Sequence, residues 1–262
     1  MAARPGFRFF GNVDVGCHVT LDDLRRHYHQ VCFSTGAQTD RRMGIPGEDL
    51  ARSHPATEFV AWYNGHPDYR DLHFDLSVER VAVVGVGNVA VDVARMLCRT
   101  PEELATTDVA DYALEALCAS RVKEVYLLGR RGPVQAAFTP PEAKELGELA
   151  GSDVRTLAEE LELDPLSRAE LESADGPAAR RKLEILEEYS RRPPAHKPRL
   201  LTLRFLVSPT ELLPDERGGV RAMRLVRNRL VAGTGGGTRA EPTGQFEELP
   251  VGLVFRSVGY RG

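Results

Sequence analysis

Apolar residues fall in short runs that end at glycine, and their spacing predicts the central elements of the chain. Residues 78–85 hold four valines in their first seven positions, a pattern typical of a parallel strand buried on both faces. Apolar residues then recur at helical spacing over 88–97, and 123–129 is again strand-like. A strand, a helix and a second strand in this order predict a βαβ unit.

The rest of the chain is more polar, and its pattern predicts elements less sharply. Residues 40–76 are rich in proline, glycine and histidine and are interpreted as a linker with one short helix near 57–63. Helix is expected over 101–120 and over most of 142–192, with a break at Asp175. Strands are expected at 200–207, 219–230 and 249–258, with the glycine run 233–238 as a hairpin tip.

The first forty residues carry a strand–helix–strand pattern of their own. Thr20 followed by Asp23 is a capping-box variant, which predicts that a helix begins there. Residues 30–34 are predicted to be a short strand. Such a segment cannot bury both faces of its strands alone, so we interpret it as half of a larger unit.

Together these elements predict an α/β fold with a doubly wound, mainly parallel Rossmann-like sheet and helices on both faces. A smaller antiparallel element is expected in the C-terminal third.

Composition and charge argue against several classes of function. A net charge of −4 is not that of a strongly basic nucleic-acid binder. No apolar run approaches the ~20 residues needed to cross a bilayer, and residues 1–16 lack a signal-peptide apolar region. Cys17, Cys32, Cys98 and Cys118 form no Cys-x-x-Cys motif, which favours free thiols in a reducing compartment. We therefore expect a cytoplasmic protein with no membrane span, no nucleic-acid partner and no metal motif.

A glycine-rich turn follows the valine strand. Gly85-Val86-Gly87-Asn88-Val89-Ala90 matches the G-x-G-x-x-A fingerprint in the strand–turn–helix context that this motif requires. Gly85 allows the tight turn, Gly87 lets the backbone approach a pyrophosphate, and Ala90 lets helix and strand pack closely. The free N–H groups at the helix start would bind the phosphates. The alternative is a glycine-rich turn in an α/β protein that binds no dinucleotide.

Two arginines, Arg130 and Arg131, follow the second strand. In an NAD site an acidic residue at this strand end holds the ribose 2′-hydroxyl. A guanidinium instead binds phosphate through paired N–H groups, so the change favours a 2′-phosphate and hence NADP(H). The alternative is an exposed basic turn after an edge strand.

The ordered set of motifs resembles the NADP-binding domain of the adrenodoxin-reductase-like ferredoxin–NADP reductases. The resemblance is carried by 85–95, 100–104, 120–123 and 129–139, with flanking matches at 10–16, 34–37, 45–48, 62–65 and 257–260. It implies a flavoprotein with two dinucleotide-binding domains. In that family a hydride moves between NADP(H) and FAD, and electrons pass to a ferredoxin-like iron–sulfur partner.

The resemblance also implies binding roles for individual residues, and it leaves the catalytic residues unknown. Glu142 matches a nucleotide-contacting glutamate, although an ordinary acid at a helix start is the alternative. The remaining matches are Val86, Gly87, Asn88 and Val89 to the pyrophosphate turn, Arg130 and Arg131 to the 2′-phosphate pair, and Val15, Thr35, Gly36 and Ala37 to segments near the flavin.

The flavin site of the family is incomplete in this sequence. Its N-terminal glycine motif should lie well before Phe10, and further flavin contacts should follow Tyr260. We therefore expect 1–40 to be a remnant of the FAD-binding domain, 41–250 the NADP-binding domain, and 251–262 the start of the return crossover. The alternative function is a non-catalytic NADP(H)-binding fragment or split subunit that lacks its own FAD site.

Surface features suggest partners as well. The charged stretch 153–192 is interpreted as a solvated helical face, with a docking surface for an acidic ferredoxin as the alternative. An unpaired sheet edge is expected to favour self-association or pairing with a separate FAD-domain half.

Overall fold

The computed structural model describes residues 4–37, 39–173, 176–233 and 237–261, and it divides into two units, Met1–Ala37 and Gln38–Gly262. The first unit holds the helix α1 (Leu21–His27). Its capping box is confirmed, because the Asp23 N–H donates to the Thr20 hydroxyl and the Asp23 carboxylate accepts from the Thr20 N–H, both at 3.1 Å. The strands expected on either side are wrong: the described residues of this unit hold one isolated bridge, between Val15 and Val19. Strands need hydrogen-bonded neighbours to persist.

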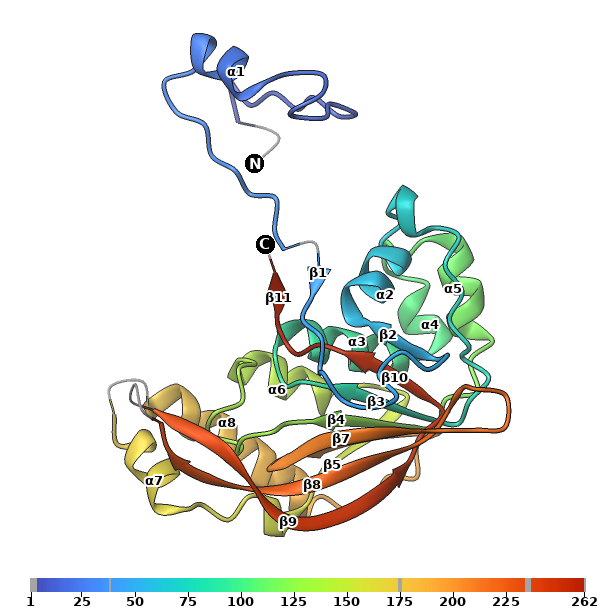
Figure 1. Cartoon of the computed structure of the whole chain (residues 1–262), viewed down its shortest axis with the longest axis vertical. Coiled ribbons are helices and arrows are strands. Elements are labelled where there is room, and N and C mark those ends of the chain that lie inside the picture. The colour runs from blue at the N-terminus through green and yellow to red at the C-terminus, as the bar shows by residue number, and fades with distance from the viewer. Residues whose placement is uncertain (1–3, 38, 174–175, 234–236, 262) are drawn as a thin grey trace. The chain divides into compact units, whose positions relative to one another are not determined.

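The second unit is built on a six-stranded parallel sheet with the order β2-β10-β3-β4-β6-β5 (Figure 1). From β3 the chain passes through α3 to β4, and it later returns to β10 on the other side of β3. This reversal is a topological switch point, where α/β proteins bind ligands beyond the carboxyl ends of the strands. The elements are β2 (Ser53–Pro55), β3 (Arg80–Val84), α3 (Asn88–Cys98), β4 (Glu124–Leu128), β5 (Ser152–Thr156), β6 (Arg199–Arg204) and β10 (Leu253–Arg256).

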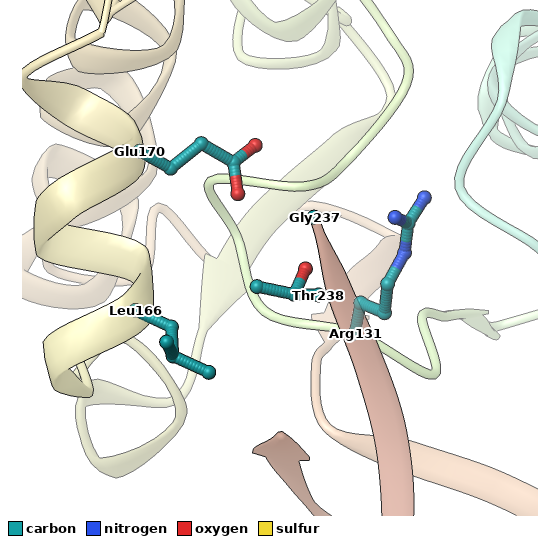
Figure 2. Close-up of a pocket in the computed structure, with 5 residues that line it drawn as sticks. All are labelled: Arg131, Leu166, Glu170, Gly237 and Thr238. Carbon is teal, nitrogen blue, oxygen red and sulfur yellow. The ribbon is translucent and has the colours of Figure 1, made fainter. Parts of the chain in front are cut away.

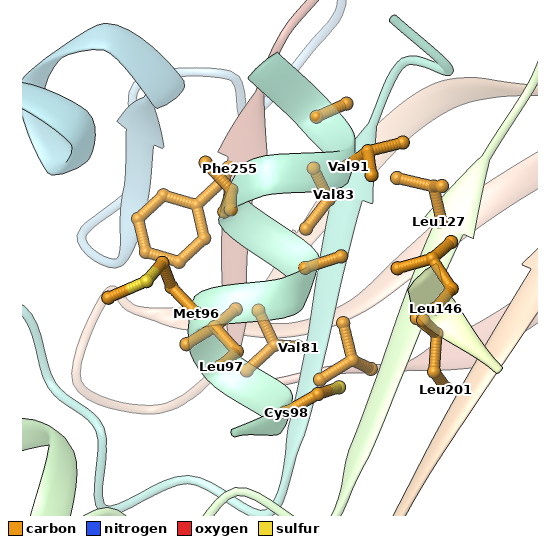
Figure 3. Packing of buried hydrophobic residues seen from close by; sticks show 14 of the residues in the cluster. Val81, Val83, Val91, Met96, Leu97, Cys98, Leu127, Leu146, Leu201 and Phe255 are labelled. Atoms are coloured by element: carbon orange, nitrogen blue, oxygen red, sulfur yellow. The ribbon is translucent and has the colours of Figure 1, made fainter. Parts of the chain in front are cut away.

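Helices cover one face of this sheet. Val81 and Val83 of β3 point to this face together with Leu127 of β4, and all three are fully buried against Leu97 and other residues of α3 (Figure 3). Burying a valine or leucine side chain contributes about 1.5–3 kcal/mol, so this layer fixes α3 against the sheet. Other helices that contribute to this layer are α2 (Ala56–Tyr63), α5 (Asp111–Cys118), α6 (Pro140–Leu146) and α8 (Gly176–Arg191).

A three-stranded antiparallel meander covers the opposite face. It consists of β7 (Val207–Pro214), β8 (Val220–Ala232) and β9 (Thr238–Pro250). Val84 and Leu128 of the parallel sheet pack against Met223 and Leu225 of the meander. The antiparallel element is therefore confirmed, whereas the expectation of helices on both faces is wrong, because the described core on this side contains strand and loop residues only.

The predicted α2, β3, α3 and β4 are confirmed. The continuous helix expected over 101–120 is wrong: it is divided into α4 (Pro101–Leu104) and α5. The hydroxyls of Thr106 and Thr107 donate to carbonyls in the last turn of α4, at 2.9 and 2.7 Å. Such side chains compete with helical backbone bonds, and α4 ends there.

The charged stretch 142–192 contains a strand that the sequence prediction missed. In β5 the residues alternate, with Ser152, Val154 and Thr156 buried. α7 (Pro165–Leu171) and the short turns η1 (Pro67–Tyr69) and η2 (Ala158–Glu160) complete the unit's helical elements among described residues. The expected break at Asp175 lies outside the described residues.

The strand expected at 219–230 is confirmed as β8, but the other two expected C-terminal strands are wrong in their bounds. Residues 200–207 cover β6 and the start of β7, and 249–258 cover the end of β9 and β10. β8 and β9 pair as a hairpin up to Ala232 and Thr238, with positions 234–236 outside the described chain. The segment interpreted as a linker, 40–76, also contributes β2 to the sheet.

β1 (Thr39–Asp40) and β11 (Tyr260–Arg261) form a separate antiparallel ribbon (Figure 1). β2 and β5 are the outer strands of the described parallel sheet. No helix in the described part of the chain is long and apolar enough to span a membrane.

Candidate functional site

The turn between β3 and α3 requires glycine at its first position. Gly85 has φ +133°, a region that L side chains rarely adopt, and an added Cβ would lie 2.1 Å from the Ser257 carbonyl oxygen. Its N–H donates to the Leu128 carbonyl at 2.9 Å. The turn is therefore held between the ends of β4 and β10, at the topological switch point.

Gly87 is the N-cap residue of α3 and leaves the helix N-terminus open. It has ordinary extended backbone, and an added Cβ would meet nothing within 4 Å. As a glycine, Gly87 supplies no side chain to cap the helix. The N–H groups of its first turn lack intrahelical acceptors and carry partial positive charge, so they fit a bound phosphate. Ala90 is fully buried and allows the close packing of helix on strand.

The loop after β4 supports the glycine turn. The Val86 carbonyl accepts from the N–H groups of Ala137 and Phe138, at 3.0 and 3.3 Å. Lys182 of α8 is buried, its ammonium donates to the Ala136 carbonyl, and it lies 5.5 Å from the centre of the Phe138 ring. Burial lowers the pKa of Lys182, partly opposed by the nearby carboxylate of Glu170. The sequence analysis did not single out this lysine.

Arg130 and Arg131 stand at the end of β4, beside the glycine turn. A Cβ added at Gly129 would lie 3.0 Å from Val86 Cγ1, which shows how closely the two strand ends approach. Arg130 is exposed and Arg131 half-buried. Within residues 4–37, 39–173, 176–233 and 237–261, neither guanidinium forms an ion pair or hydrogen bond, so both are free to bind an anion.

A cavity of about 350 Å³ lies beside Arg131. Figure 2 shows Leu166 and Glu170 from α7 on one side, with Gly237 and Thr238 at the start of β9 and Arg131 opposite them. Its volume is at the lower end for small-molecule sites. Sequence reasoning missed the lining residues of α7 and β9, because they lie far from the motifs along the chain and their types are common on surfaces.

Glu142 acts as a helix cap. Its carboxylate accepts from the Thr139 N–H at 2.6 Å and from the Thr139 hydroxyl at 2.9 Å. This capping box is the ordinary structural role of an acid at a helix start. A contact between Glu142 and a nucleotide stays a prediction.

The residues predicted to lie near a flavin belong to the Met1–Ala37 unit. Val15 is 48% exposed, and Thr35 and Gly36 are exposed as well. No described residue of this unit is buried, so its side chains form no core that would enclose a flavin. These residues alone therefore do not fit a flavin, and their role stays a prediction. No described group of three or more His, Cys, Asp or Glu side chains is placed to hold a metal ion.

The chain is similar over its whole length to known reductases. It is 46% identical over 261 residues to the NADPH-ferredoxin reductase FprA of Mycobacterium tuberculosis, covering 100% of this chain and 56% of that protein. It is 43% identical over 267 residues to the mitochondrial NADPH:adrenodoxin oxidoreductase of Bos taurus, covering 97% of this chain and 52% of the relative. The structure of Mycobacterium tuberculosis FprA in complex with NADPH matches with a TM-score of 0.88, over 100% of this chain and 56% of that one. No protein-family model matches the chain.

The six-stranded sheet and its βαβ unit define a Rossmann-like α/β protein. The chain spans about half the length of the relatives it matches. By sequence and fold the chain is similar to the NADPH-ferredoxin and NADPH:adrenodoxin reductases, and the resemblance inferred from its motifs is confirmed.

Proposed function

We propose that the chain is the NADP(H)-binding part of a flavin-dependent ferredoxin–NADP reductase. The observation that carries the proposal is the closeness of two features: the open N-terminus of α3 at Gly87, and the unpaired guanidinium groups of Arg130 and Arg131 at the end of the neighbouring strand. Together they offer donors for a pyrophosphate and, beside it, two cations for a further phosphate.

In this proposal the residues of the chain bind and orient the nucleotide. The first-turn N–H groups of α3 hold the pyrophosphate, and the two arginines hold the 2′-phosphate. The cavity beside Arg131 takes the adenosine end of the nucleotide. Asn88 and Val89 belong to the first turn of α3 and place their N–H groups toward the phosphates.

The full reaction is proposed on this similarity to named reductases. Relatives that match along the whole chain are named as NADPH-ferredoxin and NADPH:adrenodoxin reductases, which supports the reductase over a non-catalytic NADP(H)-binding module. FAD, when bound, would accept the hydride and release electrons singly to an iron–sulfur protein. Four further points stay predictions: a ferredoxin-like partner, association with a separate flavin half, self-association, and a cytoplasmic location.

Isothermal titration of the purified chain with NADP⁺ and NAD⁺ tests the nucleotide assignment. One charge-assisted hydrogen bond contributes about 1.5–3 kcal/mol, so we expect NADP⁺ to bind roughly ten- to hundredfold more tightly. Equal affinities would contradict the assignment of the two arginines to a 2′-phosphate.

An absorbance scan after adding FAD and desalting tests the flavin part. A retained flavin band, with oxidation of added NADPH, would support hydride transfer by this chain. A colourless chain that still binds NADP⁺ would restrict its own role to nucleotide binding.

A further inference from the structure

The main chain of the turn after β4 is held at three successive carbonyl groups. The Gly129 carbonyl accepts from the Val207 N–H at 3.0 Å, and the Arg131 carbonyl accepts from the Leu206 N–H at 3.1 Å. Both donors belong to the bend between β6 and β7, where Leu206 has φ +56°. The carbonyl between them, that of Arg130, is held by a side chain instead.

That side chain is Asn228 of β8. Its Nδ2 donates to the Arg130 carbonyl at 2.9 Å and to the Ser208 hydroxyl at 2.8 Å. Its main-chain N–H donates to the Leu206 carbonyl at 2.7 Å. Asn228 is only 6% exposed. A buried amide is costly unless it is hydrogen-bonded, and here its N–H donors join β8 to the turn after β4 and to Ser208 of β7.

The bond reaches the main chain of Arg130 and leaves its guanidinium free. Since Arg130 is exposed and no described side chain holds its guanidinium, the position of that group depends on the main chain from which it extends. A change in the main-chain angles on either side of the Arg130 carbonyl would change the direction in which the Arg130 and Arg131 side chains leave the turn.

We propose that Asn228 is a positioning residue that sets the preference for NADP(H) over NAD(H), by holding the Arg130 carbonyl and with it the Arg130–Arg131 turn. The inference rests on the proposed function of the two arginines. Asn228 touches neither nucleotide nor guanidinium; it acts through the backbone that both arginines share.

The test compares Asn228→Leu with Ser208→Ala. Leucine has nearly the shape of asparagine but cannot donate to the Arg130 carbonyl, and it adds no charge. Ser208→Ala removes the other acceptor of the same amide and leaves the bond to Arg130 in place. We expect Asn228→Leu to lower the ratio of NADP⁺ to NAD⁺ affinity about tenfold, and Ser208→Ala to leave it within twofold of the wild-type value.

Hydrogen exchange gives a readout that needs no ligand. We expect the amides of 129–132 to exchange faster in Asn228→Leu and at the wild-type rate in Ser208→Ala. A merely structural role would loosen β8 and β9 without changing the nucleotide ratio. If Asn228→Leu does not fold, Asn228→Ser, whose hydroxyl is too short to reach the carbonyl, replaces it with the same expected result.

The outcomes separate this inference from the proposed function. A wild-type chain without preference for NADP⁺ would overturn the assignment of the arginines, and this inference with it. A wild-type preference that survives in Asn228→Leu, or that Ser208→Ala reduces equally, would overturn the role of Asn228 alone.

Discussion

Replacing Arg130 and Arg131 with alanine removes both free cations at the end of β4. Neither side chain has a partner among the described residues, so their loss leaves no buried charge behind and the fold should keep its stability to within about 0.5 kcal/mol. The nucleotide, by contrast, loses every charged contact to its 2′-phosphate.

The expected loss follows from the number of bonds. Each charge-assisted hydrogen bond contributes about 1.5–3 kcal/mol, and exposure of Arg130 places it at the lower end. Each single variant should therefore weaken NADP⁺ binding about tenfold, and the double variant up to about a hundredfold. NAD⁺ has no 2′-phosphate, and its affinity should change less than about threefold, through weaker long-range attraction alone.

Isothermal titration of both nucleotides at about 0.15 M salt measures these changes. Arg121→Ala is the matched control, because Arg121 is an exposed arginine before the amino end of β4, whereas Arg130 and Arg131 follow its carboxyl end. An equal loss of NADP⁺ and NAD⁺ affinity in the arginine variants would refute the reasoning. A loss of NADP⁺ affinity in Arg121→Ala as large as in Arg130→Ala would refute it as well.

Three further changes test other parts of the structure. Gly85→Ala should lower the free energy of unfolding by at least about 2 kcal/mol, because Gly85 has a positive φ and the new Cβ would lie 2.1 Å from a carbonyl oxygen. Gly87→Ala should instead melt near the wild-type temperature and bind NADP⁺ more weakly. Calorimetry and nucleotide titration of the two variants measure these effects, and equal melting temperatures would contradict the prediction. Glu160→Ala should destabilise the fold by about 1–3 kcal/mol in urea unfolding, because it removes one of the two carboxylate partners of the buried Arg204 guanidinium and the acceptor of the Phe205 N–H, and a loss under about 0.5 kcal/mol would count against it. Burial, with the nearby positive charge of an arginine, lowers the pKa of His54, so the folded chain favours the neutral imidazole. The free energy of unfolding should therefore decline as the pH falls below 6.5. Thermal melts of His54→Gln should show a smaller decline between pH 7 and pH 5.

Local patterns in the sequence were sufficient to predict β3, α3 and β4 at the centre of the parallel sheet. The valines of β3 and the glycine that follows them specify a buried strand and a turn from neighbouring residues alone. β9 was not predictable in this way, since Pro242 and Gly244 are turn signals and most of its side chains are exposed. Its pairing with β8 stabilises it, and that contact is absent from any short window of sequence.

The same distinction applies to the site. Gly87 and Arg131 belong to motifs whose spacing indicates a dinucleotide, and each was identified from its immediate neighbours. Asn228 and Glu170 reach the turn only after the meander and α7 have packed beside it. An asparagine in a strand and a glutamate on a helix carry no signal of their own, so tertiary structure was needed to find them.

The central claim is that one nucleotide is held at two places, its pyrophosphate at the start of α3 and its 2′-phosphate at Arg130 and Arg131. Phosphorus NMR of NADP⁺ bound to the purified chain observes these phosphates separately. We expect both sets of signals to shift on binding, and the pKa of the bound 2′-phosphate to fall below its ordinary value of about 6, because two guanidinium groups favour the dianion. A pyrophosphate signal that shifts while the 2′-phosphate titrates as in free NADP⁺ would contradict the claim.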